Sequence, residues 1–541
     1  MNAPIAFWIV ILGLVFFFAI GLYSRRWTTT TEEFYIAGGK IPWRLNAVAM
    51  FANYASAASF LGIAGAIALG GIDSWWIALG FFAAWVVTVL VLAGPLRRSG
   101  RFTVADALAE RFAGPEVRLL TMIIAVVIGT LYLVPQLVGA GHLFVLLMGW
   151  DYQLTVLISG AFTALIVVLG GMRGTTYNQA LQGVLMIGAM AILMVGSVIL
   201  YFGGNPGEAM VRADGAIAPT LAVPVAGEIL EDFPSGGDGF AGKAAADMAR
   251  TLLPDAPSAL TPGVAVPDLP NQLSLVLGLF LGVLGLPHVL IRFYTVKNAK
   301  AAQKSAELTI VGLAIFYIMA LFVGLAALLV LFPDLVELLA AGQVGMATNT
   351  AVAMLAQRIG GEPLMGLVVA AAMAAILSTS VGLLMQMTTT IAHDGYTRVL
   401  RPRSTDRDRV RVAQASGIVL TVLAVLASLV LRDQNVAVLV AITFGIASST
   451  FAPVLLLTVW WRRLTRPGVI AGFTVGLAVS LAFTIAIFLG LPYLLGLPVL
   501  GNPALYSVPA AFAAIIAVSL LTRDTGAVDR FMALAHGRQE Q

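Results

Sequence analysis

Long apolar runs separated by short polar segments recur along the whole chain. A helix needs roughly 20 apolar residues to cross a hydrocarbon core about 30 Å thick, and most of the runs reach that length. The runs are continuous and do not alternate apolar and polar residues as the strands of a membrane barrel do. The pattern predicts an all-α polytopic membrane protein with about 13 transmembrane helices, at residues 5–23, 46–71, 74–94, 119–148, 154–170, 180–203, 271–291, 305–332, 364–393, 412–431, 436–460, 467–490 and 503–521.

Composition excludes a soluble protein. Hydrophobic residues make up 60% of the 541 residues and charged residues only 11%, whereas soluble domains are roughly half apolar and a quarter charged. The first run has no basic residue before it and carries Arg25 and Arg26 after it, so we interpret it as a retained helix and not as a cleaved signal peptide. The absence of cysteine excludes disulfides, iron–sulfur clusters and thiolate metal sites.

Lys and Arg residues gather on one side of the predicted helices. If the N-terminus lies outside, the connections on the opposite side, together with the C-terminal tail, carry 26 of the 31 Lys and Arg residues. Because basic connections stay in the cytoplasm, we expect a multi-pass protein of the cytoplasmic (inner) membrane, with its N-terminus outside and its tail, 522–541, inside. The polar segment 204–270 then lies outside as an extracytoplasmic loop or small cap, and we expect an interfacial helix within 333–363.

The predicted spans contain little of the chemistry that enzymes use. No Asp, Glu, Lys or Arg lies near the middle of a span, which argues against a proton relay of carboxylates. There is no Walker A loop for ATP and no H-E-x-x-H zinc motif. We expect no enzyme and no cofactor, and stored ion gradients remain as the energy source. The histidines stand singly and do not pair as haem ligands would: His142, His288, His393 and His536.

Small and hydroxyl residues gather in the second predicted span, at residues 51–62 (FANYASAASFLG). A break in the helix at this point would turn backbone carbonyls towards a cavity, which is how broken helices of transporters bind Na⁺. Taken alone, such a patch more often serves close packing between helices.

A second patch, residues 371–380 (AAMAAILSTS), lies in the ninth predicted span and is followed by threonines at 388–390. The adjacent hydroxyls of Ser378 and Thr379 offer a cation two neutral oxygens from one helical turn. Taken alone, hydroxyls on a helix more often bond to the carbonyl one turn earlier. The two patches together favour a cation site between the second and ninth spans.

A cation held only by neutral oxygens keeps an uncompensated charge at low dielectric constant. An anionic solute bound nearby would lower the cost of burying both charges, so a carboxylate is the favoured cargo. Because the spans carry no Lys or Arg at mid-membrane, the anion would rely on the N-termini of half-helices, on hydroxyls or on the cation itself.

Residues 282–293 (GVLGLPHVLIRF) place two glycines and a proline inside the seventh predicted span and indicate an interruption there. Interruptions five spans apart are expected when two five-helix repeats of inverted topology meet at a midplane site, and a simple proline kink explains this one equally well. We interpret His288 and Arg292, one turn apart, as an interfacial anchor or gate. Gln136 in the fourth span is either a hydrogen bond between helices or a solute contact.

Residues 33–39 (EFYIAGG), 56–65 (SAASFLGIAG) and 285–296 (GLPHVLIRFYTV) together resemble the sodium:solute symporter family, and within it the cation/acetate symporter (acetate permease) branch. The resemblance runs from about residue 32 to 465. It includes residues 170–177 (GGMRGTTY) and Phe444 with Gly445.

The resemblance implies a LeuT-type core of two five-helix inverted repeats in a single membrane transport domain, 1–541. The repeats would span 46–203 and 271–460, with an extra N-terminal helix at 5–23 and two C-terminal helices in 467–521. It also implies a Na⁺ site formed by the carbonyls of Ala52, Ala55 and Ala375 and the hydroxyls of Ser378 and Thr379. The solute would lie beside this site, near Asn53, Tyr54, Ser56, Ser59, Gln136, Phe280, Gly282 and Phe444.

Asn53 departs from acetate-type relatives, which usually carry an acidic residue at this position, and the change bears on cation stoichiometry and on cargo. We expect Na⁺-coupled symport of a short-chain monocarboxylate, of the acetate, pyruvate, lactate or propionate class, by alternating access. A Na⁺/amino acid symporter of the proline-transporting kind is the alternative within the family, and a channel or transporter-like sensor is the alternative outside it. The expected partners are Na⁺, a small carboxylate solute and the lipid bilayer, with room for a small membrane partner subunit and with no nucleic acid.

Overall fold

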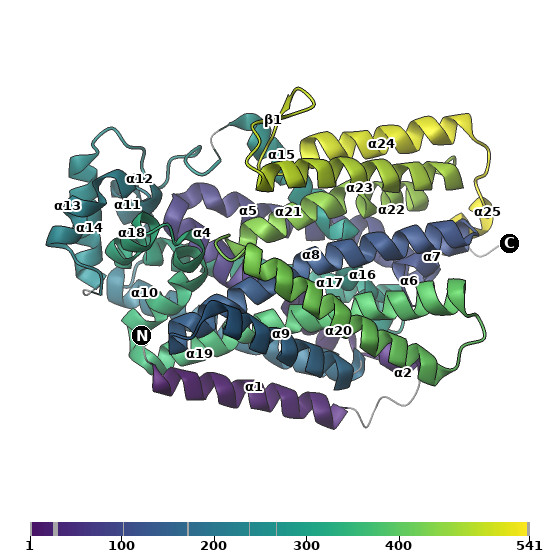
Figure 1. The fold of residues 1–541 in the computed structure, drawn as a ribbon, viewed down its shortest axis with the longest axis horizontal. Coiled ribbons are helices and arrows are strands. Elements are labelled where there is room, and N and C mark those ends of the chain that lie inside the picture. The colour runs from purple at the N-terminus through teal and green to yellow at the C-terminus, as the bar shows by residue number, and fades with distance from the viewer. Residues whose placement is uncertain are drawn as a thin grey trace.

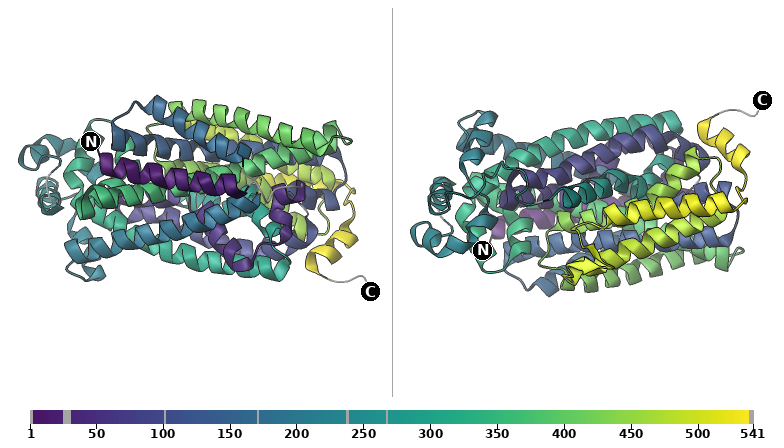
Figure 2. Two further views of the ribbon diagram at one scale, coloured as in Figure 1. Left: turned by 90° about the horizontal axis from the view of Figure 1, so that it is seen from below. Right: turned by 90° about the horizontal axis from the view of Figure 1, so that it is seen from above.

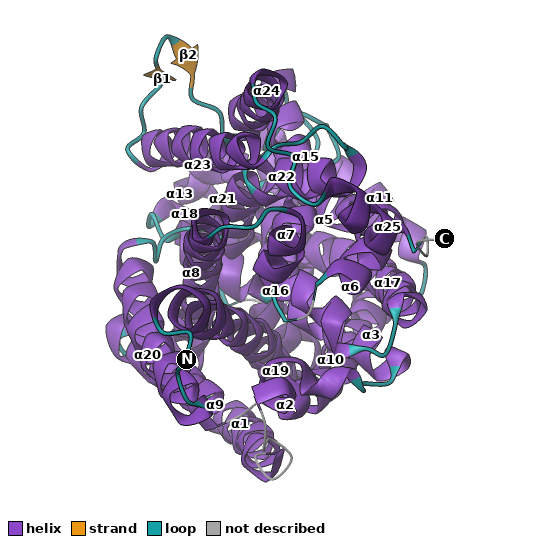
Figure 3. Ribbon diagram, turned by 90° about the vertical axis from the view of Figure 1, so that its right-hand side faces the viewer, coloured by secondary structure: helices purple, strands orange, loops and turns teal. Residues whose placement is uncertain are grey.

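The computed structural model describes residues 3–24, 31–100, 102–169, 172–236, 239–266 and 268–537 of the 541-residue chain. Arg25, Arg26, Gly170 and Gly171, which entered the sequence analysis, lie outside the described residues. In the described part the protein is a bundle of helices (Figures 1 and 3), apart from a short antiparallel hairpin of β1 (Tyr493–Leu494) and β2 (Leu497–Pro498). The predicted all-α class is confirmed.

Each of the predicted spans corresponds to one helix, to part of one, or to two consecutive helices that a break or a short 3-10 or π segment separates. In chain order these are α1 (Pro4–Ser24), α3 (Trp43–Tyr54) with α4 (Ile63–Gly70), α5 (Trp76–Thr88) with α6 (Gly94–Ser99), α8 (Pro115–Met148), α9 (Tyr152–Leu169), α10 (Met172–Tyr201), α15 (Leu269–Gly282) with α16 (Pro287–Leu290), α17 (Ala299–Val330), the second part of α19 (Val344–Thr390), α20 (Asp406–Val430), α21 (Val436–Ser449) with α22 (Phe451–Trp460), α23 (Arg466–Phe488) and α24 (Ala504–Leu521).

By length and composition, eleven helices among the described residues can cross a membrane, or twelve if the bent pair in 269–295 counts as one span. This count is close to the predicted number, and three segments account for the difference. The helical run Ala58–Ser99 counts once although it holds parts of two predicted spans, and Tyr152–Ile166 is too short to be counted. Pro206–Asp232 is counted although the sequence places it outside the membrane.

Short helices close both ends of the bundle. At one end lie α11 (Pro206–Gly215), α12 (Pro219–Ala222), α13 (Ala226–Asp232), α14 (Gly239–Leu252) and α18 (Phe332–Ala340), on the left in Figure 1. The segment 204–270 is therefore largely a helical cap. At the other end lie α2 (Thr31–Ile36), α7 (Val104–Arg111) and α25 (Val528–His536). The described chain ends lie at opposite ends of the long axis (Figure 2).

Short 3-10 or π-helical segments adjoin several of these helices. They are η2 (Ala37–Gly39), η3 (Ala58–Gly62), η4 (Gly71–Trp75), η5 (Val89–Ala93), η6 (Val223–Val225), η7 (Val283–Gly285), η8 (Ile291–Thr295) and η9 (Ile391–Leu400).

The core of the bundle is formed by α19, which packs against α8 and α10. In the most apolar 18-residue stretch of Val344–Leu400, 94% of the residues are buried. In the corresponding stretch of α1, only 22% are buried. Leu12 of α1, Leu90 and Leu426 of α20 are more than half exposed, as residues that face lipid should be. The central helices are therefore shielded from lipid.

The region 333–363 forms two helical segments, α18 and the first part of α19. The expected interfacial position is wrong for the latter, because residues such as Thr348 and Asn349 are buried. At Gly65 of α4 an added Cβ would lie 1.8 Å from the Thr348 carbonyl oxygen, so only glycine permits this contact. The helix bends at Gly360 (φ −145°, ψ 23°) and Gly361 (φ 62°, ψ −161°) before it enters the core.

Both predicted interruptions are present. In the second predicted span, α3 ends at Tyr54, Ala55 has φ −70° and ψ 77°, and the chain resumes as a helix only at residue 57. In the seventh, Leu286 has φ −98° and ψ 99°, and the two halves of the span differ in direction by 43°. Each break releases backbone groups from the helical hydrogen-bond ladder in the protein interior, where other groups must bind them.

Candidate sodium and solute site

The first break meets the hydroxyl patch of α19. Ser378 Oγ lies 2.5 Å from the carbonyl oxygen of Ala52 and 2.8 Å from that of Ala375. Thr379 Oγ1 donates to the Asn53 carbonyl oxygen at 2.9 Å. Two helices far apart in sequence thus place neutral oxygens around one point. Rotation of the hydroxyl protons exposes lone pairs, which is the kind of ligand a hard alkali cation needs.

Four of the five predicted Na⁺ ligands come together in this way: Ala52, Ala375, Ser378 and Thr379. The fifth, Ala55, lies buried at the break itself. The partner of the Thr379 hydroxyl is the Asn53 carbonyl, which the sequence analysis did not include among the ligands. The Na⁺ site itself stays a prediction, and the geometry fits it.

The Asn53 side chain joins three elements. Its Nδ2 donates to the His288 carbonyl oxygen of α16 at 3.2 Å, and its Oδ1 accepts from Gln179 Nε2 of α10 at 3.2 Å. Asn53 is 1% exposed. The Asn53 amide is therefore a hydrogen-bonding link between both broken spans and α10.

Gln179 and Arg292 extend this link, and sequence reasoning missed the network that they form. Gln179 Nε2 also donates to the Ser378 carbonyl oxygen at 2.6 Å. Arg292 donates through Nη2 to Gln179 Oε1 and through Nη1 to Thr176 Oγ1 at 2.6 Å. Arg292 is only 1% exposed, so the expected interfacial anchor is wrong for it, and the alternative, a gate, stays a prediction.

A second polar group binds the backbone released on the far side of the first break. Gln136 Oε1 accepts from the Ala57 amide at 3.0 Å, so this glutamine forms a hydrogen bond between helices. Ser56 Oγ accepts from the Ala58 amide at 3.2 Å and from the Tyr132 hydroxyl at 3.4 Å. Ser59 Oγ lies 3.1 Å from the hydroxyl of Tyr317 on α17, and each can donate to the other.

Aromatic rings surround the predicted solute position. The ring centroids of Tyr54 and Trp85 are 5.2 Å apart, those of Phe81 and Phe444 are 4.8 Å apart, and those of Tyr132 and Phe444 are 5.7 Å apart. Tyr54 and Phe444 were predicted, whereas Phe81, Trp85 and Tyr132 were not. These five rings come from α3, α5, α8 and α21 and form an apolar wall.

Two predicted solute residues have other roles. An added Cβ at Gly282 would lie 2.7 Å from the Cβ of Phe444, so this glycine allows α15 and α21 to approach closely. Phe280 is half-buried, and in the described part of the chain no ring contact joins it to the aromatic wall. Gly282 therefore serves the packing of these two helices, and Phe280 has no ring contact with the wall among the described residues; a solute contact of either residue stays a prediction.

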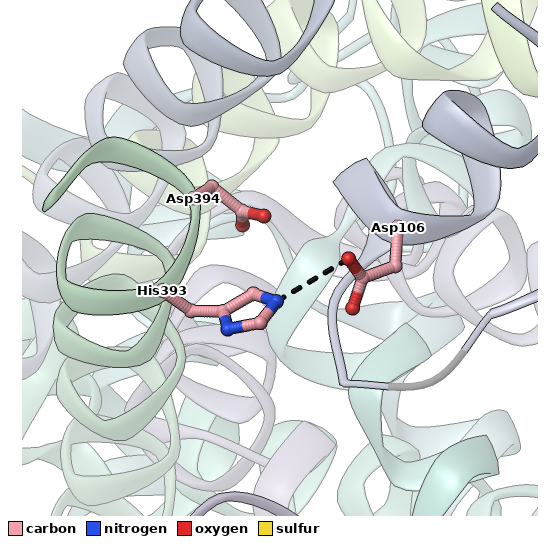
Figure 4. A group of neighbouring side chains, drawn as sticks. All are labelled: Asp106, His393 and Asp394. Carbon is pink, nitrogen blue, oxygen red and sulfur yellow. Dashed lines mark hydrogen bonds and ion pairs between the residues drawn. The ribbon is translucent and has the colours of Figure 1, made fainter. Parts of the chain in front are cut away.

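A separate cluster of titratable groups lies near the end that carries α7. Arg118 Nη1 is 2.9 Å from Asp106 Oδ1 and 2.7 Å from Asp394 Oδ1, and His393 Nε2 is 3.3 Å from Asp106 Oδ1 (Figure 4). Burial raises the pKa of Asp106, but the hydrogen bond and charge of His393 and the charge of Arg118 hold that pKa well below its usual range. Because Arg118 already supplies the positive charge between the carboxylates, we assign the cluster as an ion-pair link between α7, α8 and the end of α19.

Comparisons with known proteins agree with this picture. The chain is 34% identical over 524 residues to the uncharacterized symporter YwcA of Bacillus subtilis, covering 95% of this chain and 93% of the relative. It is 36% identical over 508 residues to a monocarboxylic acid transporter of Corynebacterium glutamicum, covering 90% of this chain and 86% of the relative.

Solved structures show the same fold. A Na⁺-coupled sialic acid symporter in a substrate-bound outward-open state matches with a TM-score of 0.69 and 17% identity, covering 96% of this chain and 98% of that one. A nucleobase-cation-symport-1 family transporter matches with a TM-score of 0.52 and 15% identity, covering 93% of this chain and 96% of that one. The predicted LeuT-type fold is confirmed.

The sequence model of the family described as "Sodium:solute symporter family" matches residues 34–476. Members of this family are multi-pass membrane transporters and not enzymes, and they couple a small solute to Na⁺. The match covers most of the chain, and the two relatives exceed 30% identity over nearly their whole length. The chain therefore belongs to the sodium:solute symporter family.

Proposed function

We propose that this protein is a Na⁺-coupled symporter of a short-chain monocarboxylate that works by alternating access. The observation that carries the proposal is the meeting of the Ser378 and Thr379 hydroxyls with the Ala52 and Asn53 carbonyls at the first helix break. In the described residues, the polar groups bonded around this point are hydroxyls, amides, carbonyls and one guanidinium. A cation bound there gains no carboxylate from the protein, so an anionic solute stabilises it best.

The choice of a monocarboxylate has two further supports. The Corynebacterium glutamicum relative is named a monocarboxylic acid transporter. The wall of aromatic rings beside the first break suits a cargo with one small charged end and a short apolar remainder.

Uptake into proteoliposomes tests the proposal. Radiolabelled acetate, pyruvate, lactate, propionate and proline would be offered with an inward Na⁺ gradient. Saturable uptake of a monocarboxylate that stops when the gradient is dissipated supports the proposal. A preference for proline points to an amino acid cargo, and flux that does not saturate points to a channel. Either result would contradict the proposal.

The proposed orientation places the N-terminus and the cap of 204–270 outside an inner membrane and the C-terminal tail in the cytoplasm. The asymmetry of Lys and Arg supports this orientation, as does the position of the two described chain ends at opposite ends of the bundle. The chain has no cysteine, so single cysteines are unambiguous probes. In whole cells a membrane-impermeant maleimide should label Thr261→Cys and spare Ala527→Cys, and the reverse pattern would invert the topology.

A further inference from the structure

His288 lies in α16, directly after the second helix break, with 1% of its surface exposed. Among the described residues, neither ring nitrogen has a hydrogen-bond partner. A neutral imidazole carries one N–H donor and one acceptor, and buried polar groups are nearly always paired. An unpaired, fully buried imidazole in a transporter core therefore points to a ligand that reaches it during transport.

Arg292 follows one turn later and is equally buried. Its guanidinium donates to Thr176 Oγ1 and Gln179 Oε1, both neutral, and in the described part of the chain it forms no ion pair. A buried cation without a counter-charge is costly, and ionisable residues inside membrane proteins usually serve function. Because the Arg292 guanidinium is positively charged, the missing counter-charge is an anion.

The two side chains connect to the aromatic and cation groups described above. The His288 ring is 5.2 Å from the Tyr132 ring, whose hydroxyl bonds to Ser56 and whose ring contacts Phe444. Arg292 reaches the Ser378 carbonyl through Gln179. An anion bound by both side chains would thus be linked to the aromatic wall through His288 and to the candidate Na⁺ site through Arg292.

We propose that His288 and Arg292 recognise the carboxylate of the transported solute. The His288 N–H donates to a carboxylate oxygen, and the Arg292 guanidinium supplies the charge that compensates the anion. The short alkyl part of the solute packs against the rings of Tyr132 and Phe444. The proposal rests on the proposed function and deepens it. It predicts that a carboxylate is preferred over its neutral amide, because the amide leaves the Arg292 charge uncompensated.

Variants at the two positions test the proposal in proteoliposomes. We expect His288→Leu and Arg292→Gln to raise the KM for acetate about tenfold or more, because each loses a bond to a charged group. Arg292→Lys keeps the charge and should lose less. The Na⁺-induced rise in melting temperature, measured without acetate, should persist in all three variants. A KM within about twofold of the wild-type value in both His288→Leu and Arg292→Gln would overturn the proposal.

Matched controls come from the same residue types buried elsewhere. His142 bonds to Asn349, and Arg111 bonds to backbone carbonyls including those of Trp461 and Arg462. His142→Leu and Arg111→Gln are expected to change stability and leave the KM for acetate unchanged. If these controls raise the KM as much as the variants at 288 and 292, the effect is a general loss of packing and the proposal fails.

A second measurement needs no substitution. The chain has four histidines, so peptide mass spectrometry can assign diethyl pyrocarbonate modification to each one. Acetate with Na⁺ should slow modification of His288 several-fold, and acetamide with Na⁺ should not. A His288 that never reacts, or that reacts equally fast with acetate present, would contradict a role in binding a solute that arrives from water.

Failure of this inference can be told from failure of the proposed function. If the wild-type protein takes up proline and no monocarboxylate, the proposed function fails, and the inference fails with it. If the wild-type protein takes up acetate with Na⁺ while both variants keep the wild-type KM, only the assignment of His288 and Arg292 is overturned.

Discussion

Gly382 of α19 faces the Asn53 side chain so closely that a Cβ at position 382 would lie 1.9 Å from Asn53 Oδ1. Gly382 follows Thr379 by three residues, so it lies on the same face of α19, one turn beyond the hydroxyls. The close approach of α3 and α19 at this point holds the first helix break against the hydroxyl patch.

Gly382→Ala should therefore damage the candidate Na⁺ site without touching any of its ligands. The added methyl must displace the Asn53 amide or separate the helices, at a cost of about 1 to 3 kcal/mol. We expect a lower melting temperature and a higher Na⁺ concentration for half-maximal uptake. Gly188→Ala is the control, because nothing lies within 4 Å of a Cβ there. If Gly382→Ala and Gly188→Ala had the same melting temperature and the same Na⁺ dependence of uptake, the close contact at Gly382 would be contradicted.

Ser378→Ala combined with Thr379→Ala should raise the Na⁺ concentration needed for half-maximal transport. Each lost hydroxyl removes one oxygen, worth about 1 to 3 kcal/mol. Ser416→Ala on α20 is the matched control, because among the described residues its hydroxyl bonds to the Ala413 carbonyl one turn earlier and to no other group. An unchanged Na⁺ dependence in the double variant would reject this site.

Gln136→Leu should destabilise the broken span. The substitution removes the acceptor of the buried Ala57 amide, and an unpaired buried amide costs about 1 to 3 kcal/mol. The melting temperature of Gln136→Leu in detergent should be lower than that of the wild-type protein. The melting temperature of Gln136→Glu should fall less, because glutamate keeps an acceptor oxygen. Equal melting of Gln136→Leu and the wild-type protein would show that the amide finds another partner.

Arg118→Gln should lower the stability of the protein at neutral pH and make it less dependent on pH. Asp106 has a depressed pKa in the folded protein, so it contributes stability above its unfolded value of 3.8, and this contribution is lost as the pH falls through the folded value. Without Arg118 the folded pKa rises towards the unfolded value, so less stability is present at neutral pH and less is lost in acid. Melting curves recorded between about pH 3 and pH 7 would show this shift to a lower and flatter profile.

The matched control for this shift is Arg409→Gln. Arg409 pairs with Asp406, a residue whose side chain is 70% exposed, so the pair contributes little. The pH profile of Arg409→Gln should match that of the wild-type protein. An Arg118→Gln profile that also matches the wild type would show that the ion-pair link does not stabilise the fold.

The sequence predicted the helices well because the bilayer imposes one length and one polarity on every span. It also located both interruptions: small and hydroxyl residues marked the first, and glycine with proline, which act locally on the backbone, marked the second. The helices within 204–270 were missed because they are short and partly polar. Pro206 and Pro219, each at the first position of a helix, were the local signal that marked two of them.

The contacts of the site were harder to foresee. The resemblance supplied Ser378 and Ala52, which the structure brings together. The contact between Gln179 and Arg292 was not predicted, because it depends on which faces of distant helices touch, and no spacing along one helix encodes that. Phe280 shows the converse: the resemblance suggested it, and in the described part of the chain its ring makes no contact with the aromatic wall.

Glycine at positions 360 and 361 gives α19 a joint between its outer part and its inner part. The outer part is wedged against α4 through the Gly65 contact, and the inner part bears the hydroxyls that face the first break. The two non-helical glycines thus divide α19 into one segment that is fixed by packing and another that carries the hydroxyls of the candidate Na⁺ site.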